Sequence, residues 1–316
     1  MTRRAAILAG LAAGVLAAAV SVAQPGSESG PSNTAAERVP RAASTPRLPT
    51  VASINLCTDQ LVLHVADPAQ IVTLSWLAAD PDESTLAEAA SRYPLNYGSA
   101  EELLRYAPDV VIAGLYTNAF TRALLRDLGF TVVDIAPANS LEDIEAQLRQ
   151  VAAAIGRSEH GERLIREMQA RIAGHRARLG SSPVDTVVVR PGGFTVEAPS
   201  LADELLQLAN LRNLPAERGL DRWGSLSIET LLHHPPELLV FASYRDADAS
   251  LANAVLAHPA LETLAERVVT ASVPAAMWSC GLPNSLDVVA VLEEAAEKAR
   301  GARTATLSRA DEGAAR

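Results

Sequence analysis

Two glutamates stand at matching places in a pattern that the chain carries twice, and paired carboxylates can dock on arginines of a partner. Glu101 and Glu229 each come two residues after a serine that suits the N-cap of a helix, Ser99 and Ser227. Two leucines, a proline, an acidic residue and an apolar run follow each glutamate, and the two copies are separated by 128 positions. On the ordinary interpretation each carboxylate favours the positive end of its helix dipole. The repetition leaves open the second interpretation, a pair of docking carboxylates.

A second set of residues follows the predicted strands at their carboxyl ends, where ligands bind in parallel α/β sheets. Aromatic residues are only 4% of the chain, yet several fall at these strand ends, where they suit a large flat ligand such as a corrin, porphyrin or catecholate complex. Arginines there could meet anionic groups, although half-buried packing or a solvated surface charge is the alternative for each residue. The candidate ligand-binding residues are Cys57, Trp76, Tyr97, Tyr116, Arg190, Phe194, Tyr244, Arg245, Trp278 and Cys280.

Cys57 and Cys280 are the only cysteines of the chain. In an exported protein two cysteines suggest one disulfide, which here would close a very long loop across the predicted ligand cleft. Two free thiols that face the ligand and can touch a metal are a second interpretation, and two inert buried thiols are a third.

The sequence lacks the patterns that would indicate a resident metal or a familiar catalytic site. The six histidines show no metal-ligand spacing, so we expect no metal site. A nucleophile elbow, a phosphate loop and a dinucleotide fingerprint are absent from the sequence. The formal net charge of −10 argues against a nucleic-acid partner.

The N-terminal residues are typical of a secretory signal. Arg3 and Arg4 precede an apolar run over residues 5–20, and small residues lead up to Ala23, after which we expect cleavage. A membrane anchor is the alternative, although the run is short for a bilayer span. Residues 24–49 are rich in Pro, Ser, Ala and Gly without periodicity, which predicts a disordered linker.

Alternating helix and strand patterns predict an α/β fold with two Rossmann-like lobes and parallel sheets. Strands are expected at 51–54, 71–74, 130–135, 186–189 and 268–273, and Thr58 can cap the first helix. A helix over 158–179 is long enough to join the lobes as a rigid strut, although an ordinary surface helix would show the same pattern. The predicted parts are a signal peptide (1–23), a linker (24–49), an N-terminal lobe (50–157), a connecting helix (158–180), a C-terminal lobe (181–300) and a flexible tail (301–316).

With these features, the chain resembles the periplasmic substrate-binding proteins of ABC importers for iron chelates, haem and cobalamin, whose two lobes are joined by one long helix. The resemblance spans residues 50–298 and rests on the signal peptide, the opening strand, the duplicated block, the strut helix, Gly192-Gly193 and Asn213. The chain departs from the family in reading Asn-Leu-Cys-Thr-Asp-Gln over 55–60, where a Pro-x-x-Thr-Glu pattern is common.

The resemblance implies a periplasmic carrier with a ligand cleft between its lobes. Glu101 and Glu229 fall where the family docks one glutamate per lobe into arginine pockets of the permease. We therefore expect a monomer that delivers a metal chelate to an ABC permease and its ATPase, without catalysis or a cofactor of its own. A ferric siderophore is placed slightly ahead of cobalamin and haem. The alternatives are a sensory module that docks on a receptor, and a periplasmic enzyme that uses Cys57 beside Asp59.

Overall fold

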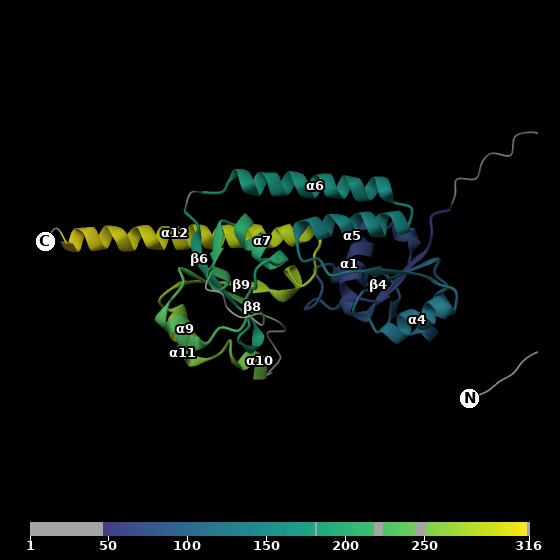
Figure 1. Cartoon of the computed structure of the whole chain (residues 1–316), viewed down its shortest axis with the longest axis horizontal. Helices are drawn as coiled ribbons and strands as arrows, with labels where there is room; N and C mark the ends of the chain where they lie inside the picture. The colour runs from purple at the N-terminus through teal and green to yellow at the C-terminus, as the bar shows by residue number, and fades with distance from the viewer. Residues whose placement is uncertain (1–46, 181, 218–223, 244–250, 315–316) are drawn as a thin grey trace, which may run out of the picture. The chain divides into compact units, whose positions relative to one another are not determined.

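The computed structural model describes residues 47–180, 182–217, 224–243 and 251–314, and these residues form two separate parallel sheets. The strand order is β3-β2-β1-β4-β5 in the first sheet and β7-β6-β8-β9 in the second. Every pairing between strands is parallel. The two expected lobes with parallel sheets are therefore confirmed, and we call them the N-terminal and the C-terminal lobe (Figure 1).

The N-terminal lobe is built from the first five strands and the first five helices. Its strands are β1 (Val51–Ser53), β2 (Ile71–Ser75), β3 (Leu95–Asn96), β4 (Val110–Gly114) and β5 (Thr131–Ile135). Its helices are α1 (Leu56–Val65), α2 (Ala87–Ala90), α3 (Ala100–Tyr106), α4 (Ala119–Asp127) and α5 (Leu141–Ala154).

The C-terminal lobe repeats this alternation with four strands. They are β6 (Val184–Val189), β7 (Leu211–Asn213), β8 (Leu238–Ser243) and β9 (Val269–Pro274). Its helices are α7 (Leu201–Leu208), α8 (Leu214–Glu217), α9 (Ile228–His233), α10 (Leu251–Ala254), α11 (Pro259–Ala265) and α12 (Asp287–Ala314).

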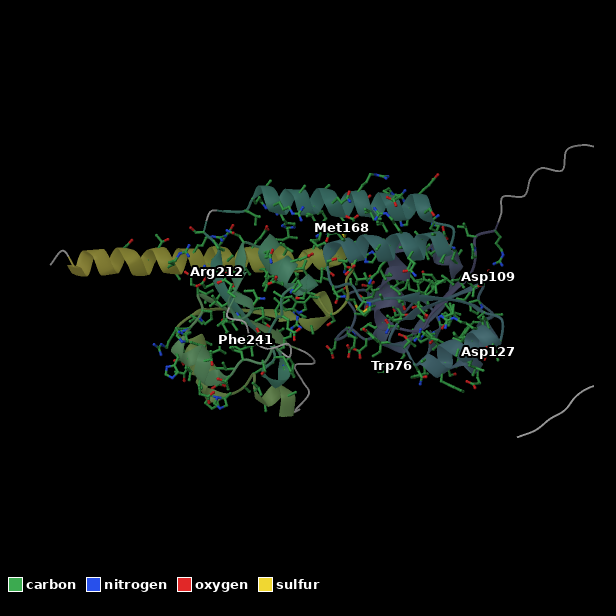
Figure 2. All side chains as sticks on the ribbon, in the orientation of Figure 1. Trp76, Asp109, Asp127, Met168, Arg212 and Phe241 are labelled. Atoms are coloured by element: carbon green, nitrogen blue, oxygen red, sulfur yellow. A yellow bond between two sulfur atoms is a disulfide. The ribbon has the colours of Figure 1, made fainter. Side chains whose placement is uncertain are left out.

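A single helix, α6 (Ser158–Ala177), carries the chain from one lobe to the other and confirms the expected connecting helix. It packs along α5 (Figure 1). Its buried side places Ile165, Met168 and Ile172 in the core, and Met168 is labelled in Figure 2. At its far end Arg171 pairs with Asp287 at the start of α12, at 2.5 Å. Core packing and this exposed charge pair therefore hold the strut against the rest of the fold.

Three hydrophobic clusters organise the lobes. One cluster lies between the N-terminal sheet and helices α3 and α4, and includes Leu103 and Leu125. A corresponding cluster in the C-terminal lobe includes Leu231 of α9 and Leu261 of α11. The third cluster takes residues from both lobes and from α6, so the inner faces share one core. The two repeated helices, α3 and α9, thus cover equivalent faces of their sheets.

Four local features differ from the sequence-based expectation. Asn55 rather than Thr58 caps α1, because the Asn55 side chain accepts hydrogen bonds from the backbone N–H groups of Cys57 and Thr58. Strands β3 and β7 are too short to show a period and were not expected. Helix α12 runs on to Ala314, through a segment expected to be a flexible tail, because good helix formers such as Ala, Leu, Glu and Arg dominate it and Gly301 is the only glycine before its last turn.

The expected signal peptide lies outside the described residues. Residues 24–46 of the expected linker also lie outside the described residues, and Arg47, within the expected linker, bonds to the Asp109 carboxylate. No helix within the described part of the chain is long and apolar enough to cross a membrane.

Candidate functional site

Two pockets meet at Ser279, where the two lobes come together. The first has a volume of about 250 Å³ and takes its wall from both lobes. The second has a volume of about 440 Å³ and is lined by Arg190, Pro191, Ala242, Ala275, Trp278 and Ser279 of the C-terminal lobe. We call them the interlobe pocket and the C-lobe pocket. Together they place a hollow at the carboxyl ends of the strands, as the fold rule predicts.

The interlobe pocket is built mainly from the loops that follow β1, β4 and β5. Asn55 ends the β1 loop, and Gly114 closes β4 so tightly that an added Cβ would lie 3.0 Å from the Asn55 side chain. The other contributors share a small or apolar character, apart from a few hydroxyl and amide groups. They are Cys57, Thr58, Leu61, Leu115, Tyr116, Ile135, Ala136, Pro137, Ala138 and Gln147, with Ser279, Cys280 and Gly281 from the C-terminal lobe.

A disulfide between Cys57 and Cys280 closes the wall of this pocket and ties α1 to the C-terminal lobe. The Cα atoms are 5.2 Å apart. The disulfide interpretation is therefore confirmed, and the two free-thiol interpretations are wrong, because both sulfur atoms are used in the bond. The same bond occupies the Cys57 thiol, which the alternative hypothesis of a periplasmic enzyme needed as its nucleophile.

A stretch of polar contacts runs beside the disulfide and reinforces the junction. The His64 ring on α1 hydrogen-bonds to the Asn284 side chain of the C-terminal lobe at 3.0 Å. Asn284 also donates to the Thr85 hydroxyl at 2.8 Å. Burial lowers the pKa of His64, which keeps the imidazole neutral and suits a hydrogen bond to an amide.

Arg190 and Trp278 form the polar part of the C-lobe pocket. The guanidinium carbon of Arg190 lies 5.8 Å from the centre of the Trp278 ring, in cation–π range. Burial lowers the pKa of Arg190, and the nearby charge of Glu197 partly offsets this. No ion pair or side-chain hydrogen bond to Arg190 is found among the described residues. Trp278 is only 7% exposed and belongs to the shared core, so its ring supports Arg190 more than it forms an open wall.

The remaining aromatic candidates lie in different places. Trp76 and Tyr97 stack with ring centres 6.2 Å apart, both well exposed, at the ends of β2 and β3; Trp76 is labelled in Figure 2. Tyr116 lines the interlobe pocket and is 85% exposed, and exposed Phe194 lies outside the linings of both pockets. Tyr244 and Arg245 lie outside the described residues. Of the sequence-predicted site residues, the structure thus groups Cys57, Tyr116 and Cys280 in one pocket and Arg190 and Trp278 in the other.

Several lining residues were missed from the sequence. Residues 136–138 directly follow β5, so the strand-end rule could have found them, but they carry no aromatic or charged group to draw attention. Gln147 reaches this loop from α5 and donates to the Ala136 carbonyl at 2.6 Å. Ser279 links the two pockets, and only its place between Trp278 and Cys280 could have indicated it.

The paired glutamates take equivalent positions in the two lobes. Glu101 is exposed in the first turn of α3, and Glu229 is exposed in the first turn of α9. Ser99 and Ser227 cap these helices as predicted. The pKa of Glu229 lies below its usual value because its carboxylate accepts hydrogen bonds from its own backbone N–H and from Ser227. Both carboxylates are therefore exposed at the starts of corresponding helices.

No group of three or more metal-ligating side chains is found within the described residues. His233 and His258 lie in the C-terminal lobe at the ends of α9 and α11, and the His258 ring caps α11 through the Ala260 N–H. His175 pairs with Glu293 at 2.8 Å, which fastens α6 to α12.

Comparison with known proteins places this chain in a family. A model of the periplasmic binding protein family matches residues 51–267. A vitamin B12-binding protein of Pectobacterium carotovorum subsp. carotovorum (strain PC1) is 25% identical over 189 residues, which are 58% of this chain and 67% of the relative.

Solved structures show the same fold. The periplasmic heme-binding protein RhuT from Roseiflexus sp. RS-1, in apo form, is 22% identical with a TM-score of 0.64, and the match covers 78% of this chain and 99% of that one. The periplasmic vitamin B12-binding protein BtuF of Vibrio cholerae is 18% identical with a TM-score of 0.58, covering 80% and 98%. The chain belongs to the periplasmic binding protein family.

Proposed function

We propose that the protein captures a metal chelate between its lobes in the periplasm and delivers it to an ABC permease. The observation that carries this proposal is the pair of pockets that meet at Ser279, with walls from both lobes. A disulfide and a connecting helix span the same junction, so the lobes can close only slightly on a guest. That geometry suits a binding protein that carries a large ligand and performs no chemistry on it.

The chelate that the site fits best has an apolar body and at least one anionic group. The interlobe pocket offers small apolar groups and Tyr116, which suit a flat ring system. The C-lobe pocket offers the half-buried Arg190 guanidinium, which would gain most from a carboxylate or another anion on the guest. Haem carries carboxylates and a ferric siderophore is often anionic, whereas cobalamin has less need of Arg190.

The named relatives shift the order of candidates that the sequence alone suggested. They bind haem or vitamin B12 by name, which moves haem ahead of a ferric siderophore, while the cationic Arg190 keeps cobalamin third. The preference for haem over cobalamin rests on Arg190, and the preference for haem over a siderophore rests on the relatives alone.

Delivery would use the two exposed carboxylates. Glu101 and Glu229 start equivalent helices, α3 and α9, which cover equivalent faces of their sheets. A permease with one arginine pocket for each lobe would hold the carrier by two charge-assisted contacts. Such contacts set the orientation of the carrier as well as its affinity.

A binding screen tests the carrier proposal. Haemin, cobalamin and a ferric siderophore are titrated into the purified protein, and quenching of tryptophan fluorescence is measured. We expect one of them to bind with a Kd in the micromolar range or below, and Tyr116→Ala to weaken it. Failure of all three chelates to bind would contradict the proposal.

A transport assay tests the docking part separately. Glu101→Arg together with Glu229→Arg should leave the Kd for the chelate unchanged and abolish uptake by cells that depend on the protein. Glu159→Arg is the matched control, since Glu159 is an exposed first-turn glutamate of α6. Normal uptake by the double variant would remove the docking proposal and leave ligand capture untouched.

A further inference from the structure

Asp59 is a fully buried carboxyl group that neither the lobe junction nor the docking surface uses. It lies in the first turn of α1, two residues after Cys57, and is 0% exposed. Its Oδ1 accepts a hydrogen bond from the Ser75 backbone N–H at 3.1 Å, and its Oδ2 accepts a short one from the Ser75 hydroxyl. No ion pair to Asp59 is found in the described part of the chain.

Asp59 hydrogen-bonds to Ser75, the residue that directly precedes Trp76. Ser75 ends β2 and stands at the N-cap of the 3-10 helix Trp76–Ala79. A serine in that place would ordinarily cap the helix, yet its side chain makes no capping bond and is turned to Asp59 instead. Trp76 follows at once and stacks on Tyr97. The carboxyl group therefore fixes the turn from which the exposed aromatic pair projects.

We propose that Asp59 is a positioning residue for the Trp76–Tyr97 pair, and that gain and loss of its proton makes the grip on a chelate depend on pH. This inference rests on the proposed function and extends it, because it takes the aromatic pair, which follows β2 and β3 and lies outside the linings of both pockets, to continue the ligand wall along the carboxyl edge of the N-terminal sheet. An ionised Asp59 accepts both Ser75 donors in charge-assisted hydrogen bonds, which are roughly twice as strong as neutral ones. A protonated Asp59 offers one oxygen as an acceptor and turns the other into a donor, so one of these two bonds is lost or reversed.

The surroundings explain why this proton is exchanged near neutral pH. Burial raises the pKa of Asp59 to about 7, against the lowering effect of hydrogen bonds from Ser75 and Ser53. The elements packed against α1 include β1, β2, β4 and the 3-10 helix Trp76–Ala79, none of which carries a titratable side chain.

Charged or titratable groups near α1 belong to α1 itself, to α5, and to α6 and α12, whose His160 and Asp287 lie near His64. On α5, Arg149 pairs with Glu145 and Glu162, and Asp143 accepts from the Asn139 backbone. Glu142 of α5 is exposed. On α1, the His64 ring bonds to Asn284. None of these charged groups contributes to the raised pKa of Asp59, which is set by burial and by its hydrogen bonds.

The first test follows Trp76 without any ligand. The emission of the natural chain minus that of Trp76→Phe is recorded between pH 5.5 and 8.5. We expect a single step with its midpoint near neutral pH, and no step in Asp59→Asn, which has the same shape but cannot ionise. Asp82→Asn is the matched control, because Asp82 is exposed in the turn that follows the same 3-10 helix.

A second variant keeps the inference testable if Asp59→Asn does not fold. Ser75→Ala keeps the carboxyl group and removes one donor that lowers its pKa. The midpoint of the fluorescence step should therefore move to higher pH in Ser75→Ala. A purely structural role for Asp59 predicts no such movement. An unchanged midpoint, or no step in the natural chain, would overturn the inference.

The second test adds haemin as the probe. The ratio of the Kd of Asp59→Asn to that of the natural chain is measured at pH 6 and pH 8, so that titration of haemin itself cancels. We expect this ratio to change by about fivefold between the two pH values, the natural chain gaining affinity at pH 8. A constant ratio would show that the aromatic pair does not grip the chelate. If haemin, cobalamin and the siderophore all fail to bind, the carrier proposal fails, and the fluorescence step alone then decides the role of Asp59 at Trp76.

Discussion

The N-terminal lobe brings neutral groups to the junction between the lobes, whereas the C-terminal lobe brings a cation. Tyr116, small apolar side chains and one end of the disulfide come from the first lobe, and Arg190 on Trp278 comes from the second. Away from the junction the two lobes are alike, because each presents an exposed glutamate at the start of a corresponding helix, α3 or α9. Equal outer faces suit a symmetric pair of contacts, and unequal inner faces suit one asymmetric guest.

The largest expected effect concerns the outer faces. Reversing a single docking charge, as Glu101→Arg or as Glu229→Arg, should lower chelate uptake at least about tenfold while the Kd for the chelate stays the same. If docking treats the lobes alike, the two single variants should lose uptake to a similar extent. Uptake that depends on one glutamate alone would show that only that lobe docks through its acidic helix start.

The next effect concerns the bond that joins the two inner faces. Cys57→Ser with Cys280→Ser removes a crosslink between residues 223 positions apart. Loss of a crosslink that closes so long a loop should lower the free energy of unfolding by roughly 3–5 kcal/mol, which denaturant titration measures. The single variants are less clean, because each leaves a free thiol. A change below about 1 kcal/mol would mean that α6 and the shared core hold the lobes together without the disulfide.

A smaller effect should come from Arg190, the cation that the C-terminal lobe alone brings to the junction. Arg190→Gln should weaken an anionic chelate about tenfold and leave a neutral one nearly unchanged. Haemin and its dimethyl ester form a suitable pair of probes, since they differ only in the carboxylates. Arg267→Gln serves as the control, because Arg267 is exposed in the same lobe. Equal weakening of both probes would mean that Arg190 supports Trp278 instead of meeting an anion.

The last effect concerns stability and pH. The pKa of Asp59 in the folded chain is about 7, above its value of 3.8 in an unfolded chain. A raised carboxyl pKa contributes stability at low pH that is lost as the pH rises from about 4 to about 7. The melting temperature of Asp59→Asn should therefore rise relative to that of the natural chain as the pH increases through this window. The difference between the two should stay constant above it. A constant difference between the two melting temperatures would contradict the assignment of the buried proton to Asp59.

Much of the fold could be predicted because local signals and tertiary structure agree along this chain. The serine caps, the proline-acidic turns and the apolar runs of the repeat give α3, β4, α9 and β8 at the expected places. Strands β3 and β7 escaped because two or three residues carry no readable period. The cap of α1 was misplaced because Asn55 and Thr58 are both good capping residues, and only the folded backbone shows which one accepts the N–H groups.

The candidate site was predictable only where chemistry and topology coincide. Arg190 and Tyr116 were found because they are distinctive residues at strand ends, and the cysteine pair because it is the only one. Residues 136–138 also follow a strand, but they are small and uncharged, so no side-chain chemistry indicated that they line a pocket. The burial of Trp278 depends on neighbours from distant segments, and no local pattern shows it.

The inner core that both lobes share sets how the molecule must come apart. Gly281 fits so closely against the opposite lobe that an added Cβ would lie 2.4 Å from the Ala138 Cβ and 3.1 Å from Ile144. Neither half can lose its structure without stripping apolar cover from the other, so heating should produce one calorimetric transition in place of two. For the same reason, either half expressed by itself should be insoluble, even though each contains a complete sheet.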